Sequence, residues 1–145
     1  MIKSPLGDSA RSTVNESPVR FESGLRRALL AAQTAEDNRG IDIVVLDTRE
    51  LTPMFDYFVI ATGTSRRQIH AMSEEIDHAL EDRMGDRRLG IEGYEESRWI
   101  LLDYGDVVVH LFEPETRDYY ALEDLWGHAK RVPRSTEKGD AGSGP

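Results

Sequence analysis

The tripeptide Gly63-Thr64-Ser65 follows a short apolar segment and precedes a helical pattern, an arrangement found in phosphate-binding turns. Backbone N–H groups at the start of a helix favour an anion, so a turn of this kind can hold a phosphate group. The same residues also occur where a glycine makes a tight bend and a serine caps the next helix. The second interpretation needs no ligand and is the preferred one.

Nucleotide transfer would require further residues that hold magnesium. Enzymes of the nucleotidyltransferase class place two carboxylates one residue apart on the strand that follows such a turn. Here Asp56 precedes a strand, and Asp103 and Asp106 are separated by two residues at a turn. That spacing does not reproduce a two-metal platform. We therefore predict no catalytic, cofactor-binding or metal-binding residue, and a nucleotide- or phosphate-binding enzyme is the alternative.

The four histidines do not form a predicted ligand set. His70 and His78 are two helical turns apart, too far to share one ion, and His128 ends a helical pattern. We expect these three side chains to face solvent. His110 differs because it interrupts an apolar strand, and we interpret it as a hydrogen-bonded or interface residue, since no nucleophile is in evident reach. The chain has no cysteine, which excludes disulfides and thiolate sites.

Residues 97–112, SRWILLDYGDVVVHLF, read as a β-hairpin around a four-residue turn. Neighbouring strand residues point to opposite sides, so Trp99, Leu101 and Asp103 share one side while Ile100 and Leu102 share the other. One side must pack on helices. An apolar side that stays exposed and is rimmed by charge is typical of a binding surface. The alternative is a central strand that helices cover on both faces.

The remaining pattern predicts one α/β domain. We expect a disordered leader at 1–20, a folded domain at 21–131 and a flexible tail at 132–145. The elements follow the order αββαββα, which favours a mixed β-sheet with flanking helices. In chain order they are a helix capped by Ser23 and ended by Gly40, strands at 41–46 and 57–61, a helix from Ser65 to Gly85, the 97–112 hairpin, a turn at 113–116 and a short helix at 119–129.

The charge argues against nucleic acid as a direct partner. The net charge is −9; residues 1–20 carry three basic and two acidic side chains and residues 132–145 two of each, so the segment between carries −10. Phosphate binding needs a basic face, whereas an acidic domain suits a basic protein partner or simply solubility. No apolar run approaches the roughly 18 residues of a membrane span. With no secretory pattern either, we expect a cytoplasmic protein.

Several motifs together resemble the ribosomal silencing factor family, also called Iojap-like or RsfS. The resemblance covers roughly residues 23–130. The motifs that carry it are Asp56, Ala-Thr-Gly-Thr-Ser at 61–65, Trp99 with Asp103-x-Gly105-Asp106, Val109-His110, and Arg117-x-x-Tyr120-x-Leu122-Glu123-x-Leu125-Trp126.

The resemblance implies a fold similar to that of nucleotidyltransferases without their metal carboxylates, and a function without catalysis or cofactor. Members bind the large ribosomal subunit through universal large-subunit ribosomal protein number fourteen on its intersubunit face. They block joining of the small subunit and repress translation when nutrients are scarce. Members also occur as homodimers.

These expectations combine into one hypothesis about the hairpin. One side packs on helices, and the other meets the ribosomal protein, with acidic neighbours steering it toward a basic surface. The proposed contact residues are Trp99, Leu101, Asp103, Asp106, Val109, His110 and Glu113. Arg117 and Glu123 are expected to brace the last helix or to form a structural ion pair. A plain dimerisation module, in which the exposed hairpin face pairs with itself, is a third possibility.

Overall fold

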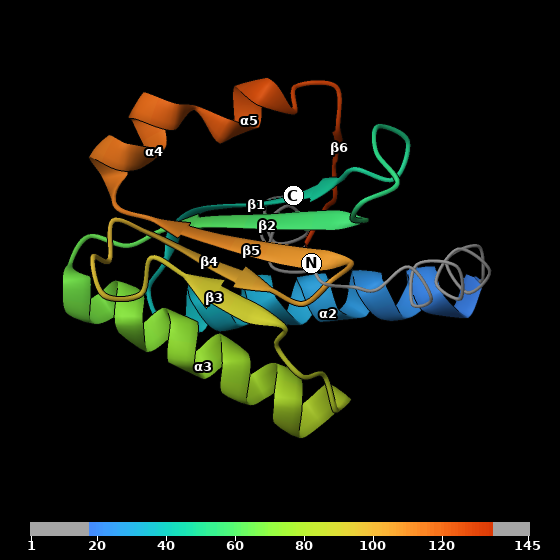
Figure 1. Cartoon of the computed structure of the whole chain (residues 1–145), viewed down its shortest axis with the longest axis horizontal. Helices are drawn as coiled ribbons and strands as arrows, with labels where there is room; N and C mark the ends of the chain where they lie inside the picture. The colour runs from blue at the N-terminus through green and yellow to red at the C-terminus, as the bar shows by residue number, and fades with distance from the viewer. Residues whose placement is uncertain (1–17, 135–145) are drawn as a thin grey trace, which may run out of the picture.

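The computed structural model describes residues 18–134, so the predicted leader and tail lie largely outside the described residues. A mixed sheet separates two layers of helices (Figure 1). The elements are α2 (Pro18–Asp37), β1 (Ile41–Asp47), β2 (Tyr57–Thr62), α3 (Arg66–Met84), β3 (Gly90–Glu92), β4 (Trp99–Asp103), β5 (Val107–Phe112), α4 (Pro114–Tyr120), α5 (Leu122–Leu125) and β6 (Lys130–Arg131). No helix in this part of the chain is long and apolar enough to cross a membrane.

The sheet has six strands in the order β3-β4-β5-β2-β1-β6. The central pair β2 and β5 is parallel, and the other pairs are antiparallel, which confirms the predicted mixed sheet. The predicted hairpin is β4 and β5, with Trp99 opposite Phe112 and Asp103 opposite Val108. In its turn, the Asp103 carboxylate accepts a hydrogen bond from the Gly105 N–H at 2.8 Å, and Gly105 has a φ of 91°. A positive φ of this kind costs glycine little.

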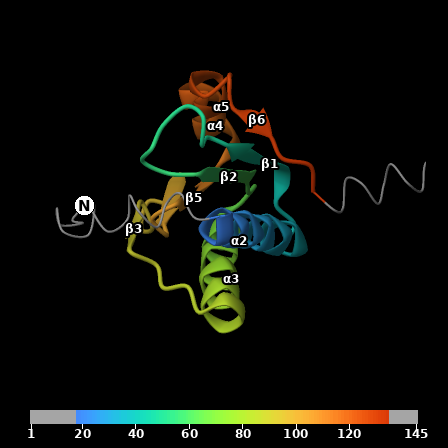
Figure 2. The same ribbon diagram turned by 90° about the vertical axis from the view of Figure 1, so that its right-hand side faces the viewer.

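Helices α2 and α3 cover one face of the sheet (Figure 2). Small alanines on α2 and long apolar side chains on α3 pack against Val59, Ile100 and Leu102 to form the larger core cluster. The start of α3 is as predicted, because the Ser65 side chain accepts a hydrogen bond from the Gln68 N–H. Its end is also as predicted, at Gly85 with a φ of 64°.

Three boundaries differ from the sequence expectation. Helix α2 begins at Pro18, so Ser23 lies inside it and does not cap it; its hydroxyl instead accepts from the Arg27 guanidinium at 3.4 Å. The expected turn at 113–116 is wrong, because Pro114 starts α4, where the missing N–H costs nothing. The expected last helix is divided into α4 and α5 by Ala121, whose φ is 45°. The short edge strands β3 and β6 were not predicted.

The opposite face of the sheet, called the outer face below, is covered by α4, α5 and the loop before β2 (Figures 1 and 2). Arg117 of α4 anchors this layer: it bonds both carboxylate oxygens of Glu123, the Thr62 hydroxyl and the Asp42 carbonyl, all at 2.6–3.1 Å. The expected ion pair of Arg117 and Glu123 is confirmed, and the hydrogen bonds from Arg117 lower the pKa of Glu123. Coverage is incomplete over β4, which leaves part of the outer face open.

Candidate functional site

A groove on the outer face lies between the start of β4 and α4, and it is called the outer groove below. It has a volume of about 570 Å³. Aromatic and acidic side chains dominate its lining: Glu96, Arg98, Trp99, Glu113, Glu115, Thr116, Tyr119 and Tyr120. The antiparallel pairing of β4 with β5 places Trp99 beside Phe112, directly before the residues that start α4. The groove is therefore built by the hairpin and the short helix together.

Trp99 is fixed in place within this groove. Its ring lies 4.7 Å from the Phe112 ring and 4.9 Å from the Tyr120 ring, centroid to centroid. Its indole N–H donates to Nδ1 of His110 at 3.1 Å. The Nδ1 atom of His110 is therefore the acceptor, and its ring proton resides on Nε2. A half-buried tryptophan held in this way loses little conformational freedom when a partner covers its exposed part.

Helix α4 and its continuation add unusually exposed apolar side chains. Tyr119 is 80% exposed, Tyr120 49% and Leu125 75%. The Tyr119 and Tyr120 rings meet edge to face with centroids 5.0 Å apart. Sequence reasoning missed Tyr119, because the expected helix began at that residue and gave no reason to place it beside β4. The two consecutive tyrosines after Arg117 were the feature of the sequence that could have indicated an exposed aromatic site.

The hairpin sides are largely as expected. Ile100 and Leu102 are fully buried against the helices, whereas Trp99, Leu101 and Asp103 are half-buried on the outer face.

Val109, Asp106 and His110 are the exceptions among the proposed contact residues, because all three are buried. Val109 lies opposite Leu102 in the antiparallel register, so it points to the helix side and is fully buried, and its expected outward position is wrong. Asp106 is buried and ion-paired with Arg27, so it is not available as a surface carboxylate. Glu113 lines the outer groove and accepts a hydrogen bond from Thr116.

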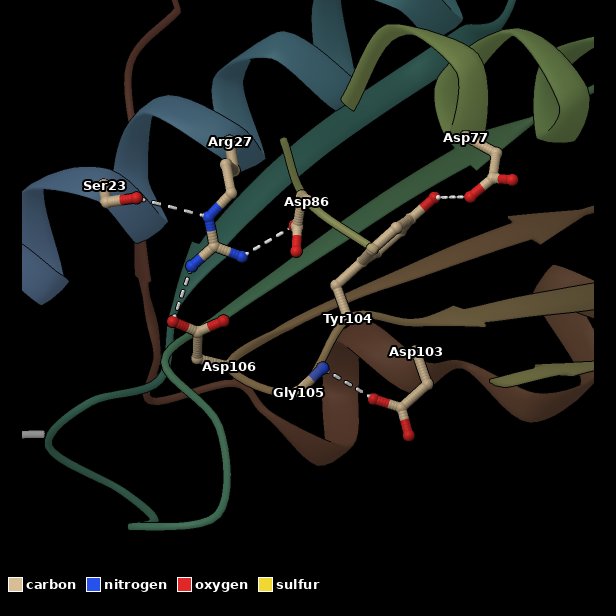
Figure 3. A network of polar contacts seen from close by, with 8 residues as sticks. All are labelled: Ser23, Arg27, Asp77, Asp86, Asp103, Tyr104, Gly105 and Asp106. Carbon is tan, nitrogen blue, oxygen red and sulfur yellow. Dashed lines mark hydrogen bonds and ion pairs between the residues drawn. The ribbon is translucent and has the colours of Figure 1, made fainter. Parts of the chain in front are cut away.

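The tetrapeptide Asp103-Tyr104-Gly105-Asp106 is the centre of a structural polar network (Figure 3). Arg27 reaches from α2 to Asp106 at 2.7 Å and to Asp86 at 2.9 Å. The Tyr104 hydroxyl donates to Asp77 at 2.9 Å. Burial raises the pKa of Asp86, which the Arg27 charge opposes, and burial also raises the pKa of Tyr104. These carboxylates stabilise the fold, and the described residues hold no cluster of three or more groups suited to a metal ion.

The Gly63-Thr64-Ser65 turn uses its polar groups within the chain. Ser65 caps α3, and Gln68 accepts hydrogen bonds from both the N–H and the hydroxyl of Thr64. A bound phosphate would have to displace the Gln68 side chain from the Thr64 N–H. The contacts therefore support the helix-capping interpretation of this turn.

A serine and a histidine also lie in contact, between α3 and the loop before β4. Ser97 Oγ is 2.6 Å from Nε2 of His70, and the Tyr94 carbonyl is 2.7 Å from the same nitrogen. Because a carbonyl only accepts, this nitrogen carries the hydrogen and cannot act as a base toward Ser97. Ser97 is buried with a φ of 65°, and His70 stacks on Tyr94. The contact between Ser97 and His70 holds the loop against α3. The expectation that His70 faces solvent is therefore wrong.

The other histidines follow the prediction in part. His78 and His128 are exposed, as expected, and His78 pairs with Asp82 one helical turn away. His110 is only 4% exposed, and its ring meets the Phe58 ring at a centroid distance of 4.7 Å. Its Nε2 atom has no hydrogen-bond partner among the described residues. Burial lowers the pKa of His110 to about 3.

Because His110 is buried in its neutral form, we expect the protein to lose stability in mild acid. The unfolded state binds a proton near the ordinary pKa of 6.5 while the folded state resists it down to about 3, so stability falls as the pH falls through that window. From pH 7 to pH 5, His110 should cost about 2 kcal/mol of unfolding free energy. We expect urea unfolding of His110→Asn, which keeps an acceptor for Trp99, to lack this part of the pH dependence. Equal pH dependence of both proteins would contradict the buried neutral ring.

Comparisons with known proteins point to one family. The family described as "Ribosomal silencing factor during starvation" matches residues 22–143. A "Ribosomal silencing factor RsfS" of Chromobacterium violaceum is 45% identical over 101 residues, which cover 70% of this chain and 82% of that protein. A crystal structure of a Chromobacterium violaceum protein has a TM-score of 0.69 and 42% identity, covering 72% of this chain and 86% of that one. A mouse relative, "Mitochondrial assembly of ribosomal large subunit protein 1", is 35% identical over 109 residues, which cover 74% of this chain and 46% of that protein.

Proposed function

The chain belongs to the ribosomal silencing factor family, and we propose that it represses translation under nutrient limitation by binding the large ribosomal subunit. The proposed contact is universal large-subunit ribosomal protein number fourteen on the intersubunit face. A protein bound there blocks the small subunit by occupying its place. The name of the mouse relative, which refers to the large ribosomal subunit, supports the choice of subunit.

The observation that carries the proposal is the outer groove with its exposed aromatic rim. Tyr119 and Tyr120 stay exposed, whereas the other aromatic side chains from Phe55 onward in the described part of the chain are buried wholly or in part. Tryptophan and tyrosine are enriched among the residues that dominate interface energies. Trp99 lies in the groove with its ring held by Phe112 and Tyr120, so little freedom is lost when a partner covers it.

Charge supports a basic partner. Residues 21–131 carry −10, because the chain has a net charge of −9 and residues 1–20 and 132–145 together contribute +1. Glu96, Glu113 and Glu115 line the outer groove itself. Acidic side chains around an apolar contact raise the rate of encounter with a basic surface and make it sensitive to salt. A basic ribosomal protein fits this surface better than an exposed phosphate backbone does.

The proposed contact surface keeps only some of the residues that the sequence hypothesis included. The proposed contacts that remain on the outer face are Trp99, Leu101, Asp103 and Glu113, and Tyr119 and Tyr120 join them. The buried His110 does not contact the partner but holds the Trp99 ring in place through its hydrogen bond. The repression is steric and needs no chemistry from the chain. We also propose that the protein acts in the cytoplasm. In a proposed homodimer, a second copy covers this surface, so dimer formation and ribosome binding compete for it.

The test is co-sedimentation of the purified protein with large subunits, small subunits and joined ribosomes at moderate salt. We expect it to pellet with isolated large subunits, much less with joined ribosomes and not with small subunits. Failure to pellet with large subunits would overturn the proposal. Thermal stabilisation by magnesium and nucleotide would then be measured for the alternative, a phosphate-binding enzyme.

A further inference from the structure

We propose that the outer groove binds one arginine side chain of the partner, held between aromatic rings and carboxylates. The inference rests on the proposed function, because it names the group on the protein partner that the groove recognises. Three aromatic rings and three carboxylates line one groove of about 570 Å³. That combination matches the two properties of a guanidinium group, which is planar and positively charged.

The aromatic side of the groove is preorganised. Tyr120 lies 4.9 Å from Trp99 and 5.0 Å from Tyr119, so the three rings form a continuous series. The Trp99 orientation is fixed by the hydrogen bond to His110, and Tyr119 exposes most of its surface to incoming groups. Ring faces attract a cation through their quadrupole, most strongly for tryptophan. An arginine stacks on such faces better than a lysine does.

The charged side of the groove favours a cation as well. The lining contains one basic residue, Arg98, and three acidic ones, Glu96, Glu113 and Glu115, so its formal charge is −2. Among the described residues, Arg98 forms no ion pair with these glutamates and lies over no aromatic ring, so it does not already fill the role. An uncharged apolar group would leave the net negative charge of the lining without compensation. The lining therefore selects a cationic side chain over an aliphatic one.

A small-molecule titration tests the groove without the ribosome. The probe is N-acetyl-arginine amide, and the control is the citrulline counterpart, which has nearly the same shape and no charge. We expect saturable shifts of the Trp99 indole and Tyr119 ring resonances in NMR spectra with the arginine compound only. An equal response to both compounds, or no response to either, would overturn the inference.

Variants test the same groove in large-subunit binding. Tyr119→Leu keeps an apolar side chain but removes the ring, and we expect about tenfold weaker binding, while Tyr119→Phe should bind as the natural protein does. Glu96→Gln with Glu115→Gln should also weaken binding about tenfold. The matched control is Glu75→Gln with Glu81→Gln, which makes the same charge change on exposed positions of α3, on the opposite face of the sheet.

The two proposals fail in different ways. Natural protein that binds large subunits, together with Tyr119→Leu and Glu96→Gln/Glu115→Gln variants that bind equally well, would overturn the arginine groove and leave the silencing function standing. Natural protein that does not bind large subunits would overturn the silencing function, and the arginine titration would then decide whether the groove recognises a cation. Equal weakening by both double glutamine variants would overturn the groove and indicate a general effect of charge.

Discussion

Replacing Trp99 with alanine is expected to weaken binding to large ribosomal subunits by roughly 30-fold or more, the loss typical of an interface hot spot. The ring lines the outer groove and lies against Phe112 and Tyr120. Its removal takes away the contact surface and also frees the Tyr120 ring to move. The affinity is measured by co-sedimentation over a concentration series of large subunits.

The control for this variant must separate binding from folding, because Trp99 also donates to the buried His110. Trp126→Ala is the matched variant: Trp126 is half-buried on the same face, packs on Phe55 and Phe58, and does not line the groove. We expect it to lower the unfolding temperature with little change in affinity. A folded Trp99→Ala protein that binds normally would show that the groove is not the contact surface.

Replacing Arg27 with alanine is expected to lower the unfolding free energy by about 3–5 kcal/mol, the cost of leaving a buried charge without its partner. Arg27 joins Asp106 in the hairpin turn to Asp86 after α3, and all three side chains are at least 85% buried (Figure 3). The total unfolding free energy of a domain of this size is only about 5–15 kcal/mol, so the variant should be close to unfolding. Urea unfolding at pH 7 measures the loss.

An exposed ion pair provides the comparison. Lys130 and Glu50 lie 3.6 Å apart with both side chains more than 70% exposed, and Lys130→Ala should cost no more than about 1 kcal/mol. Similar losses for the Arg27 and Lys130 variants would contradict the structural role assigned to the Arg27 network. A large loss for Arg27→Ala alone would confirm that Asp106 acts in the fold and not at the surface.

Local patterns in the sequence predict much of this fold. The apolar runs on either side of Asp103-Tyr104-Gly105-Asp106 predict the hairpin, and Ser65 and Gly85 predict both ends of α3. Each of these features depends on residues close together in the chain. The alternation along β4 also separates Trp99 and Leu101 from Ile100 and Leu102, as in the structure, but four apolar residues in a row do not reveal which of the two sides is buried.

The features that sequence reasoning missed depend on distant residues. The side to which Val109 points follows from its register against Leu102, which the turn sets and the apolar run does not reveal. Asp106 looks like a surface carboxylate until Arg27, 79 positions away, is placed beside it. The outer groove requires α4 to lie along the start of β4, and the expected helix boundary at Tyr119 concealed that contact.

The central claim is that occupation of the large subunit prevents joining, and a subunit-joining assay tests it most directly. Purified large and small subunits are mixed with increasing amounts of the protein, and joining is followed by light scattering, with the Trp99→Ala and Trp126→Ala variants in parallel. We predict that joining falls in proportion to the occupied large subunits, and that Trp99→Ala requires a correspondingly higher concentration. Joined ribosomes that form at the normal rate and carry bound protein would contradict the account.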